Sequence, residues 1–484
     1  MSTPQTPPAI SVRGGAGSID ARYLDIERLG RLYSDVGGRL ASAAWDDKLE
    51  AADGDLLASA PLAPRTFAEA ERAILEATYG PKGLSARALV IEAESFCFVA
   101  VVEIYRTADE LRRAALESVS YGLGFVVGVT LPSVALTGGV AYLGLHVLAP
   151  EQADELKAWL GVEGMDLLEE HPEVVELLVN GGGGLLDGLG ANPLSAPLLD
   201  VLGLDGFHPT TGAAADDLGD LLFGDYHGEL NPDYDGPQFD LPPPHDTQDL
   251  MHDLATVNDG QDGVITVQKI AGADGTVRWI VDLPGTDRFM DEHTIRNMGS
   301  NMNLIAGDDT AYGEAIRTAM EQAGVRPGDP VMLVGHSQGG MQAAALAADP
   351  DFPYHVTNVV TAGSPIATSG IPDHVHVLSL ENSADVVPHT DGEANPATAD
   401  HVTVTANSPH GSVTANHDLG VYEGIAEAVD HSTDPSVQAA LGSMDGFFDG
   451  GEGSSTITYQ TQQGDQIRPA GINDPLEMAL NIIF

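Results

Sequence analysis

The stretch at residues 330–347 constrains the fold most strongly. A short apolar run there passes through Gly-His-Ser-Gln-Gly into an Ala- and Leu-rich segment. This order predicts a buried strand, a sharp turn and a helix, with Ser337 at the tip of the turn. Gly335 and Gly339 are expected where a Cβ would collide with the neighbouring strand and helix. The Ser337 hydroxyl would then project above the C-terminal edge of a sheet, where a substrate can reach it.

A Gly-x-Ser-x-Gly match alone is a weak signal, because a glycine-rich chain contains such a match by chance. The alternative interpretation is an ordinary loop serine. The context favours a functional turn, since strands and helices alternate around it. We expect strands at 263–270, 276–283, 331–334, 355–361, 375–380 and 401–405, and helices at 311–323 and 340–348. The first two strands read as a hairpin, and the whole pattern predicts an α/β domain with a mostly parallel sheet covered on both faces.

A serine hydroxyl becomes a good nucleophile only when a neighbouring base removes its proton, and an acid must orient that base. Asp385 and His417 each follow an expected strand, at the same sheet edge as Ser337. Their order along the chain, Ser, Asp and then His, is that of the α/β-hydrolases. Asp391 is an alternative acid. Alternative bases are His389, His401 and His410.

Residues 247–435 resemble the class 3 lipase branch of the α/β-hydrolases. The resemblance rests on Gly-His-Ser-Gln-Gly-Gly at 335–340, Thr-Ala-Gly-Ser-Pro at 361–365 and Asp-x-Val-Pro at 385–388. His417 with Tyr422 five residues later resembles the histidine segment of that family, and residues 284–286 stand where it has an Arg-Gly-Ser/Thr turn.

This resemblance implies that Ser337 is the nucleophile, His417 the base and Asp385 the orienting acid. Thr286 and the backbone N–H of Gln338 would form the oxyanion hole. Two departures, Pro284 in place of arginine and Gln338 in place of leucine, put a typical triglyceride preference in doubt. No cofactor and no metal is required. The segment 286–309 carries methionines and other apolar residues that suit either a cover over the site or ordinary packing.

The sequence therefore predicts a serine ester hydrolase that cleaves a lipid or other acyl ester through an acyl-enzyme. Acyl transfer would use the same three residues. The alternative from another class is a non-catalytic, hydrolase-like binding or secretion-associated module. Nucleic-acid binding is not expected, because 21 Lys and Arg against 72 Asp and Glu give a net charge of −51, which repels phosphate backbones.

The N-terminal part reads differently. Residues 1–15 are expected to be disordered, and residues 16–180 to form an α-helical domain of antiparallel hairpins. Trp45, expected near an inter-helix region, and the pair Tyr105 and Asp109 give this domain a resemblance to modules of actinobacterial type VII secretion. The resemblance implies contact with a secretion machinery, although the Trp-x-Gly turn is missing.

Two stretches in this half of the chain are open to several interpretations. Residues 121–149 contain no Asp, Glu, Lys or Arg, and an uncharged stretch of this length could cross or touch a membrane. Its Gly and Pro breaks suit a buried helical hairpin as well. Residues 181–246 are rich in Gly, Pro and Asp and read as an inter-domain linker. Residues 436–484 form a C-terminal extension of unassigned role.

Two remaining features bear on localisation and redox chemistry. The first residues have neither a basic start nor an apolar core, so no signal peptide is recognised. A cytoplasmic location, or export by a route other than Sec such as type VII, is expected. Cys97 is the single cysteine and is expected to be a buried small hydrophobe rather than a reactive thiol.

Overall fold

The fold is taken from a computed structural model. It describes residues 8–15, 19–51, 54–79, 179–289, 294–448 and 450–468, and the separate positions 84, 87, 88, 91, 120–122, 124, 125, 128 and 129. The chain divides into two compact units. The smaller is Ile19–Ala115, and the larger combines Met1–Ser18 with Leu116–Phe484.

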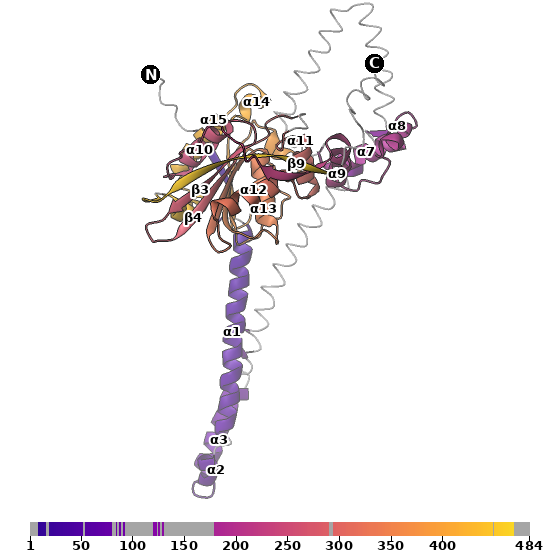
Figure 1. Ribbon diagram of the computed structural model, residues 1–484. Helices are drawn as coiled ribbons and strands as arrows, with labels where there is room; N and C mark the ends of the chain where they lie inside the picture. The colour runs from indigo at the N-terminus through magenta and orange to yellow at the C-terminus, as the bar shows by residue number, and fades with distance from the viewer. Residues whose placement is uncertain are drawn as a thin grey trace, which may run out of the picture. The chain divides into compact units, whose positions relative to one another are not determined.

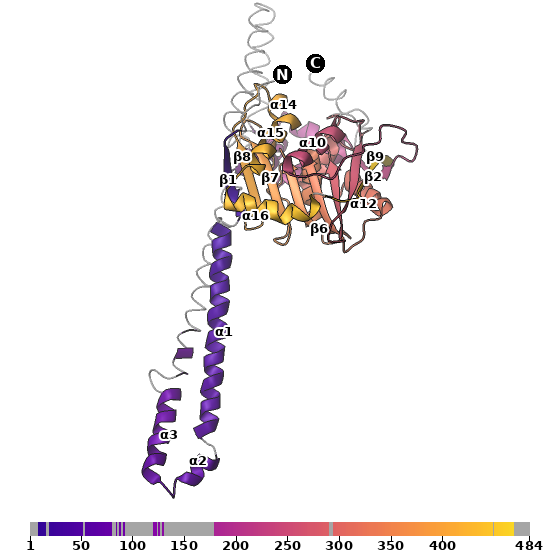
Figure 2. The same ribbon diagram turned by 90° about the vertical axis from the view of Figure 1, so that its left-hand side faces the viewer.

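The smaller unit is helical where it is described. It contains α1 (Ile19–Ala51), α2 (Gly54–Ser59) and α3 (Pro64–Tyr79), and α3 packs against α1 and α2 (Figure 2). These helices agree with the α-helical region expected before the α/β domain. Trp45 lies inside α1, however, not near a turn between helices. Cys97 and the Tyr105 to Asp109 segment lie outside the described residues.

The larger unit is built on a nine-stranded sheet with the order β1-β8-β7-β6-β5-β4-β3-β9-β2. The strands are β1 (Ile10–Gly14), β2 (Asp225–Leu230), β3 (Val264–Ala271), β4 (Val277–Leu283), β5 (Pro330–His336), β6 (His355–Ala362), β7 (His376–Asn382), β8 (His401–Ala406) and β9 (Ser455–Arg468). The five strands β4 to β8 are parallel neighbours. The outer strands pair antiparallel, including the expected β3–β4 hairpin. The prediction of an α/β fold is confirmed.

Helices cover both faces of this sheet (Figures 1 and 2). The helices of the α/β domain are α10 (Thr247–Asn258), α11 (Met298–Ala306), α12 (Ala311–Ala323), α13 (Gln338–Ala348), α14 (Val413–Asn416), α15 (Leu419–Asp430) and α16 (Pro435–Met444), with short 3-10 helices η2 (Val387–His389) and η3 (Asp445–Phe447). The apolar side chains of α12 and α13 pack on one face, and those of α10, α15 and α16 on the other. The strands between these layers are apolar on both sides, as buried parallel strands require.

The prediction of disorder for residues 1–15 is wrong for Ile10–Gly14. These residues form β1, which pairs antiparallel with β8. Ile10 and Val12 pack against the core beside α15 and α16, whereas Ser11 and Arg13 are exposed. The Pro- and Gly-rich composition of residues 1–15 suggested disorder. The strand was also hard to recognise because its partner β8 lies far away in the sequence.

Residues 181–246 are not simply a linker. They contain α7 (Gly182–Ala191), α8 (Ala196–Leu202), α9 (Thr211–Leu222) and β2, with a small core of Leu186, Leu199, Leu204, Ala214 and Leu221. Figure 1 shows the three helices together, with α9 beside α11, and these two helices are in contact. Glycine allows two backbone segments to approach closely here, because a Cβ on Gly184 would lie 2.1 Å from the Tyr121 carbonyl oxygen.

The α/β domain also extends beyond residue 435. Helix α16 packs against β7 and β8, and β9 lies in the sheet between β3 and β2. The expected boundaries of 247 and 435 are therefore too narrow at both ends. The reason is that strands close the edges of this sheet from segments far apart in sequence.

The apolar stretch 121–149 is described only in part. Its described positions 121, 122, 124, 125, 128 and 129 are helical, and the other residues lie outside the described ones. In the portion of the chain that is described, no helix combines the length and apolar character needed to cross a membrane.

Candidate active site

The sharp turn between β5 and α13 holds Ser337 in a strained conformation. Its φ of 54° and ψ of −122° make it the only non-glycine residue with a positive φ among the described residues. A Cβ on Gly335 would lie 2.4 Å from the Gly339 carbonyl carbon, and a Cβ on Gly339 would lie 1.8 Å from the Leu283 oxygen. The steric requirement expected for both glycines is present. Such strain persists only where the surroundings enforce it, as at functional sites.

Asp385 and His417 form a hydrogen-bonded pair at the same sheet edge. The distance from His417 Nδ1 to Asp385 Oδ2 is 2.5 Å, and the hydroxyl of Tyr422 donates to the same oxygen, also at 2.5 Å. The other oxygen accepts from the Val387 N–H at 3.0 Å. Because a carboxylate only accepts, Nδ1 carries the proton and Nε2 keeps its lone pair. That Nε2 atom is buried and has no partner.

Tyr422 is suited to act as a permanent donor in this pair. Burial, and then the neighbouring Asp385, hold the pKa of its hydroxyl well above 10. Tyr422 is fully buried on α15. It therefore stays protonated at neutral pH and keeps a proton to donate to Asp385.

Two neighbours place the His417 ring against the turn that carries Ser337. The ring of His336 lies 4.5 Å from it, and His336 Nε2 contacts the His417 carbonyl at 3.0 Å. On the other side, Gly363 has a φ of 59°, and a Cβ there would lie 3.0 Å from His417 Cε1. The Ser337 N–H bonds the carbonyl of Ala362, next to Gly363.

Burial also keeps His336 neutral. The pKa of His336 is lowered well below its usual value, first by burial and then by His417. No hydrogen bond joins His417 Nε2 to Ser337 within the described part of the chain. Such contacts are often long before substrate binds and tighten in the complex.

The two expected oxyanion-hole residues lie on either side of Ser337. A Cβ on Gly285 would come within 3.0 Å of the Ser337 Cβ, so the turn that holds Thr286 passes directly beside the serine. The Thr286 hydroxyl accepts a hydrogen bond from Asn301 at 3.1 Å. Gln338 is the first residue of α13, where backbone N–H groups have no acceptor within the helix. Its side-chain amide donates to the Asn297 carbonyl at 2.8 Å.

A comparison with protein families agrees with this geometry. Residues 296–441 match the PGAP1-like alpha/beta domain. This family belongs to a lipase- and esterase-like superfamily of α/β-hydrolases, so the similarity suggests a hydrolase- or esterase-like function. No curated protein and no solved structure matches the chain.

The matched PGAP1-like segment includes Ser337, Asp385 and His417 but begins after Thr286. The match names neither class 3 lipases nor type VII secretion modules. Those two resemblances therefore stay predictions.

The alternative bases and acid occupy other positions in the PGAP1-like domain. His401 Nε2 contacts the Ser379 hydroxyl at 2.9 Å within the sheet, and burial lowers its pKa to about 4. His410 contacts the Ser408 hydroxyl at 3.1 Å. His389 ends the short helix η2.

Asp391 has a different role from that of Asp385. It accepts from the backbone N–H of Ala367 at 2.6 Å, and burial raises its pKa to about 7. It thus joins two loops at the sheet edge, whereas the carboxylate of Asp385 faces His417.

The segment 286–309 contains packed and exposed parts. Helix α11 fills its second half and contacts α9 and α13. Ile295 is buried, whereas Phe289 is 61% exposed. The packing of Ile295 agrees with the ordinary-packing interpretation, and Phe289 is the apolar residue that this account does not explain.

Sequence reasoning missed the buried residues that contact Asp385 or lie next to the turn of Thr286. Tyr422 was noticed only for its spacing from His417, and no spacing rule gives its contact with Asp385. Arg296 and Asp287, which form a buried ion pair behind Thr286, carried no signal. Both stand in a segment rich in charged and polar residues, so nothing in the sequence singled them out.

Proposed function

We propose that this chain is a serine hydrolase that cleaves a lipid or other acyl ester through a covalent acyl-enzyme. The observation that carries the proposal is the His417–Asp385 pair, which leaves Nε2 without a partner beside the strained turn of Ser337. A positioned base and a strained, partly exposed serine are what nucleophilic catalysis requires. The similarity to a PGAP1-like domain supports the same reaction class.

In the first half of the reaction Ser337 Oγ attacks the acyl carbonyl carbon while His417 Nε2 takes the hydroxyl proton. The carbonyl oxygen gains negative charge, and donors at Thr286 and the Gln338 N–H stabilise that charge. The intermediate then expels the alcohol, which receives the proton from His417. The acyl group remains on Ser337.

In the second half, water gives a proton to His417 Nε2 and attacks the acyl carbon. The bond to Ser337 Oγ breaks, and the serine regains its proton. Asp385 keeps its negative charge throughout and stabilises the imidazolium. The hydrogen bond from Tyr422 holds this carboxylate in place while the imidazole changes charge.

A fluorophosphonate probe tests this proposal directly, because it reacts with an activated serine and not with an ordinary one. Wild type, Ser337→Ala and His417→Ala are compared, followed by esters of graded acyl length. The exposed His410 gives the control variant His410→Ala. Labelling of wild type and of the control, with loss in the other two variants, is expected.

Well-folded wild type that resists the probe and hydrolyses none of the esters would overturn the proposal. That outcome would favour the non-catalytic binding module. Labelling that survives Ser337→Ala would place the nucleophile elsewhere in the chain.

A further inference from the structure

A fully buried guanidinium lies behind the turn that holds Thr286. Arg296 is 1% exposed and donates to Asp287 twice, from Nε to Oδ2 at 2.9 Å and from Nη2 to Oδ1. Its Nη1 also donates to the Val264 carbonyl at 3.4 Å, at the start of β3. Taking a guanidinium out of water is strongly unfavourable unless it is paired in this way.

The ion pair fixes the end of the turn. Asp287 directly follows Thr286, its N–H donates to the Arg296 carbonyl at 3.0 Å, and its Oδ2 accepts from the Gly263 N–H at 2.8 Å. Backbone and side-chain bonds therefore close the base of the loop between Asp287 and Arg296. Thr286 is the last residue before this closure.

The same guanidinium reaches the start of the turn through Tyr312. Arg296 Cζ lies 5.9 Å from the centre of the Tyr312 ring, and the tyrosine is fully buried on α12. The Tyr312 hydroxyl donates to the Pro284 carbonyl at 3.4 Å. Pro284 and Thr286 enclose Gly285, where an added Cβ would lie 3.0 Å from the Ser337 Cβ. The network around Arg296 thus contacts the turn at both ends.

We propose that Arg296 is a positioning residue for the oxyanion turn and acts through Asp287 and Tyr312. The inference rests on the serine-hydrolase function proposed above. An oxyanion donor is effective only at a fixed place, because donors that must reorganise during the reaction lose their advantage. Arg296 sets the place of Thr286 relative to Ser337 without touching the substrate.

The test compares Arg296→Lys with Arg317→Lys. The lysine keeps the charge but lacks the two-pronged geometry that binds one carboxylate with two nitrogens. Arg317 is a matched control, since it pairs with Asp349 at 2.5 Å and lies 5.7 Å from the ring centre of Phe352. Turnover is measured per serine labelled by the fluorophosphonate, so that unfolded molecules do not count.

We expect Arg296→Lys to lower kcat about 10- to 100-fold, with KM within about threefold, because the loss falls on transition-state stabilisation. Arg317→Lys is expected to keep wild-type kcat per labelled serine. A lowered melting temperature with unchanged kcat per labelled serine in Arg296→Lys would assign Arg296 a purely structural role and overturn the inference.

Amide hydrogen exchange of residues 285–287 provides a readout that needs no activity. Faster exchange at this turn in Arg296→Lys and not in Arg317→Lys is expected. If wild type is inactive but this difference appears, the proposed function fails while the positioning of the turn stands. Equal exchange in both variants contradicts the positioning itself.

Tyr312→Phe keeps the inference open to test if Arg296→Lys does not fold. This variant removes only the hydroxyl that donates to Pro284. We expect a smaller loss in kcat, about 3- to 10-fold, again with little change in KM. Wild-type kcat and wild-type exchange at the turn would remove Tyr312 from the network.

Discussion

Two histidines in the larger unit use their ring nitrogens differently. His417 Nδ1 bonds Asp385, and its Nε2 has no partner. His208, before α9, contacts Asp187 through Nδ1 at 2.7 Å and Asp217 through Nε2 at 2.8 Å. Because carboxylates only accept, both contacts are hydrogen bonds only when both nitrogens of His208 carry protons.

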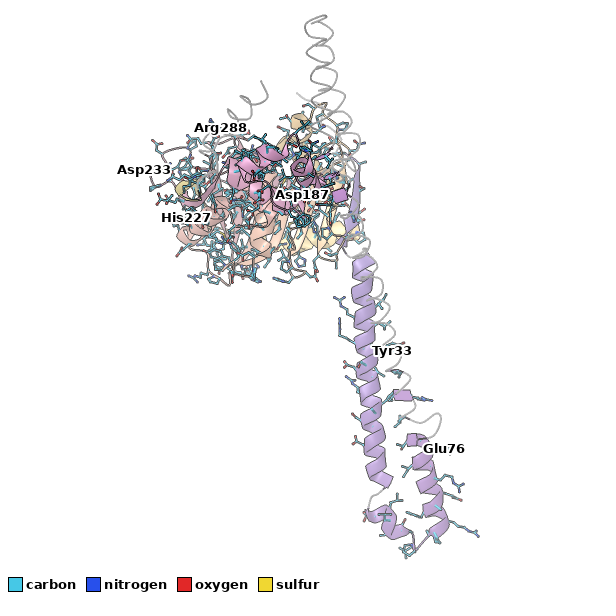
Figure 3. All side chains as sticks on the ribbon, turned by 90° about the vertical axis from the view of Figure 1, so that its right-hand side faces the viewer. Tyr33, Glu76, Asp187, His227, Asp233 and Arg288 are labelled. Carbon is cyan, nitrogen blue, oxygen red and sulfur yellow. The ribbon has the colours of Figure 1, made fainter. Side chains whose placement is uncertain are left out.

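His208 therefore links α7, which carries Asp187 (Figure 3), to α9, which carries Asp217, through both of its ring nitrogens. The Tyr121 hydroxyl donates to the second oxygen of Asp187 at 2.6 Å. His417 also bonds a carboxylate but is 18% exposed, against 1% for His208, and keeps one nitrogen available. The comparison teaches that a neighbouring acid alone does not mark a candidate base: the second ring nitrogen must also be without a partner.

Replacing each histidine by glutamine tests this contrast with the largest expected effect. His417→Gln is expected to lower kcat/KM by about four orders of magnitude or more, because no base remains to activate Ser337. His208→Gln is expected to lower the melting temperature, since it breaks the link between Asp187 and Asp217. Esterase rates per folded molecule and thermal unfolding measure the two outcomes. Equal losses of turnover in both variants would break the comparison.

Replacing the acid beside each histidine is expected to give the next largest effect. Asp385→Asn is expected to lower kcat by about 10³- to 10⁴-fold, because an amide donor favours the wrong tautomer of His417. Asp217→Asn serves as the control, since Asp217 is 45% exposed and bonds a histidine outside the site. Steady-state kinetics on esters distinguish the two variants. A wild-type rate in Asp385→Asn would point to another orienting acid.

The contact from Tyr422 to Asp385 is expected to matter less. Tyr422→Phe removes one of two donors to the same carboxylate oxygen, and we expect kcat to fall about 3- to 10-fold. Without this hydrogen bond, Asp385 holds the ring of His417 less firmly in place. Steady-state kinetics on esters measure the change. A wild-type rate in Tyr422→Phe would mean that the Tyr422 hydroxyl does not contribute to the reaction.

The smallest expected effect concerns His401, whose Nε2 contacts the Ser379 hydroxyl and not a carboxylate. Burial lowers the pKa of His401 to about 4 from 6.5, so between these values the unfolded chain binds more protons than the folded one. Stability is therefore lost as pH falls below about 6.5, by about 3 kcal/mol at pH 4. Denaturant melts at pH 4.5 and 7 are expected to differ less in His401→Gln than in wild type. An identical difference in both proteins would contradict this.

The parts of this site that follow local rules were predictable from sequence. Ser337 was visible because a sharp turn demands glycine at 335 and 339, and that demand leaves a pattern. Asp385 and His417 were reachable because parallel strands end at one edge. Tyr422 and Arg296 were not, because a hydrogen bond between distant segments leaves no pattern in a single sequence.

The incorrect predictions of the fold have the same cause. The glycines of α7 looked like those of a flexible linker, but a Cβ on Gly188 would lie 2.3 Å from the Phe125 carbonyl oxygen. Glycine in a helix can mean close approach as readily as flexibility. Strands β1, β2 and β9 were missed because their partners are distant, and period-two signals in short or polar strands are weak.

The position of β9 has a consequence for synthesis on the ribosome. This strand lies between β3 and β2, so both of those strands expose unpaired edges until residues 455–468 have left the exit tunnel. Open edges of this kind pair readily with other chains. A nascent chain stalled before residue 455 should therefore be a better client for chaperones, and a faster aggregator, than one released at full length.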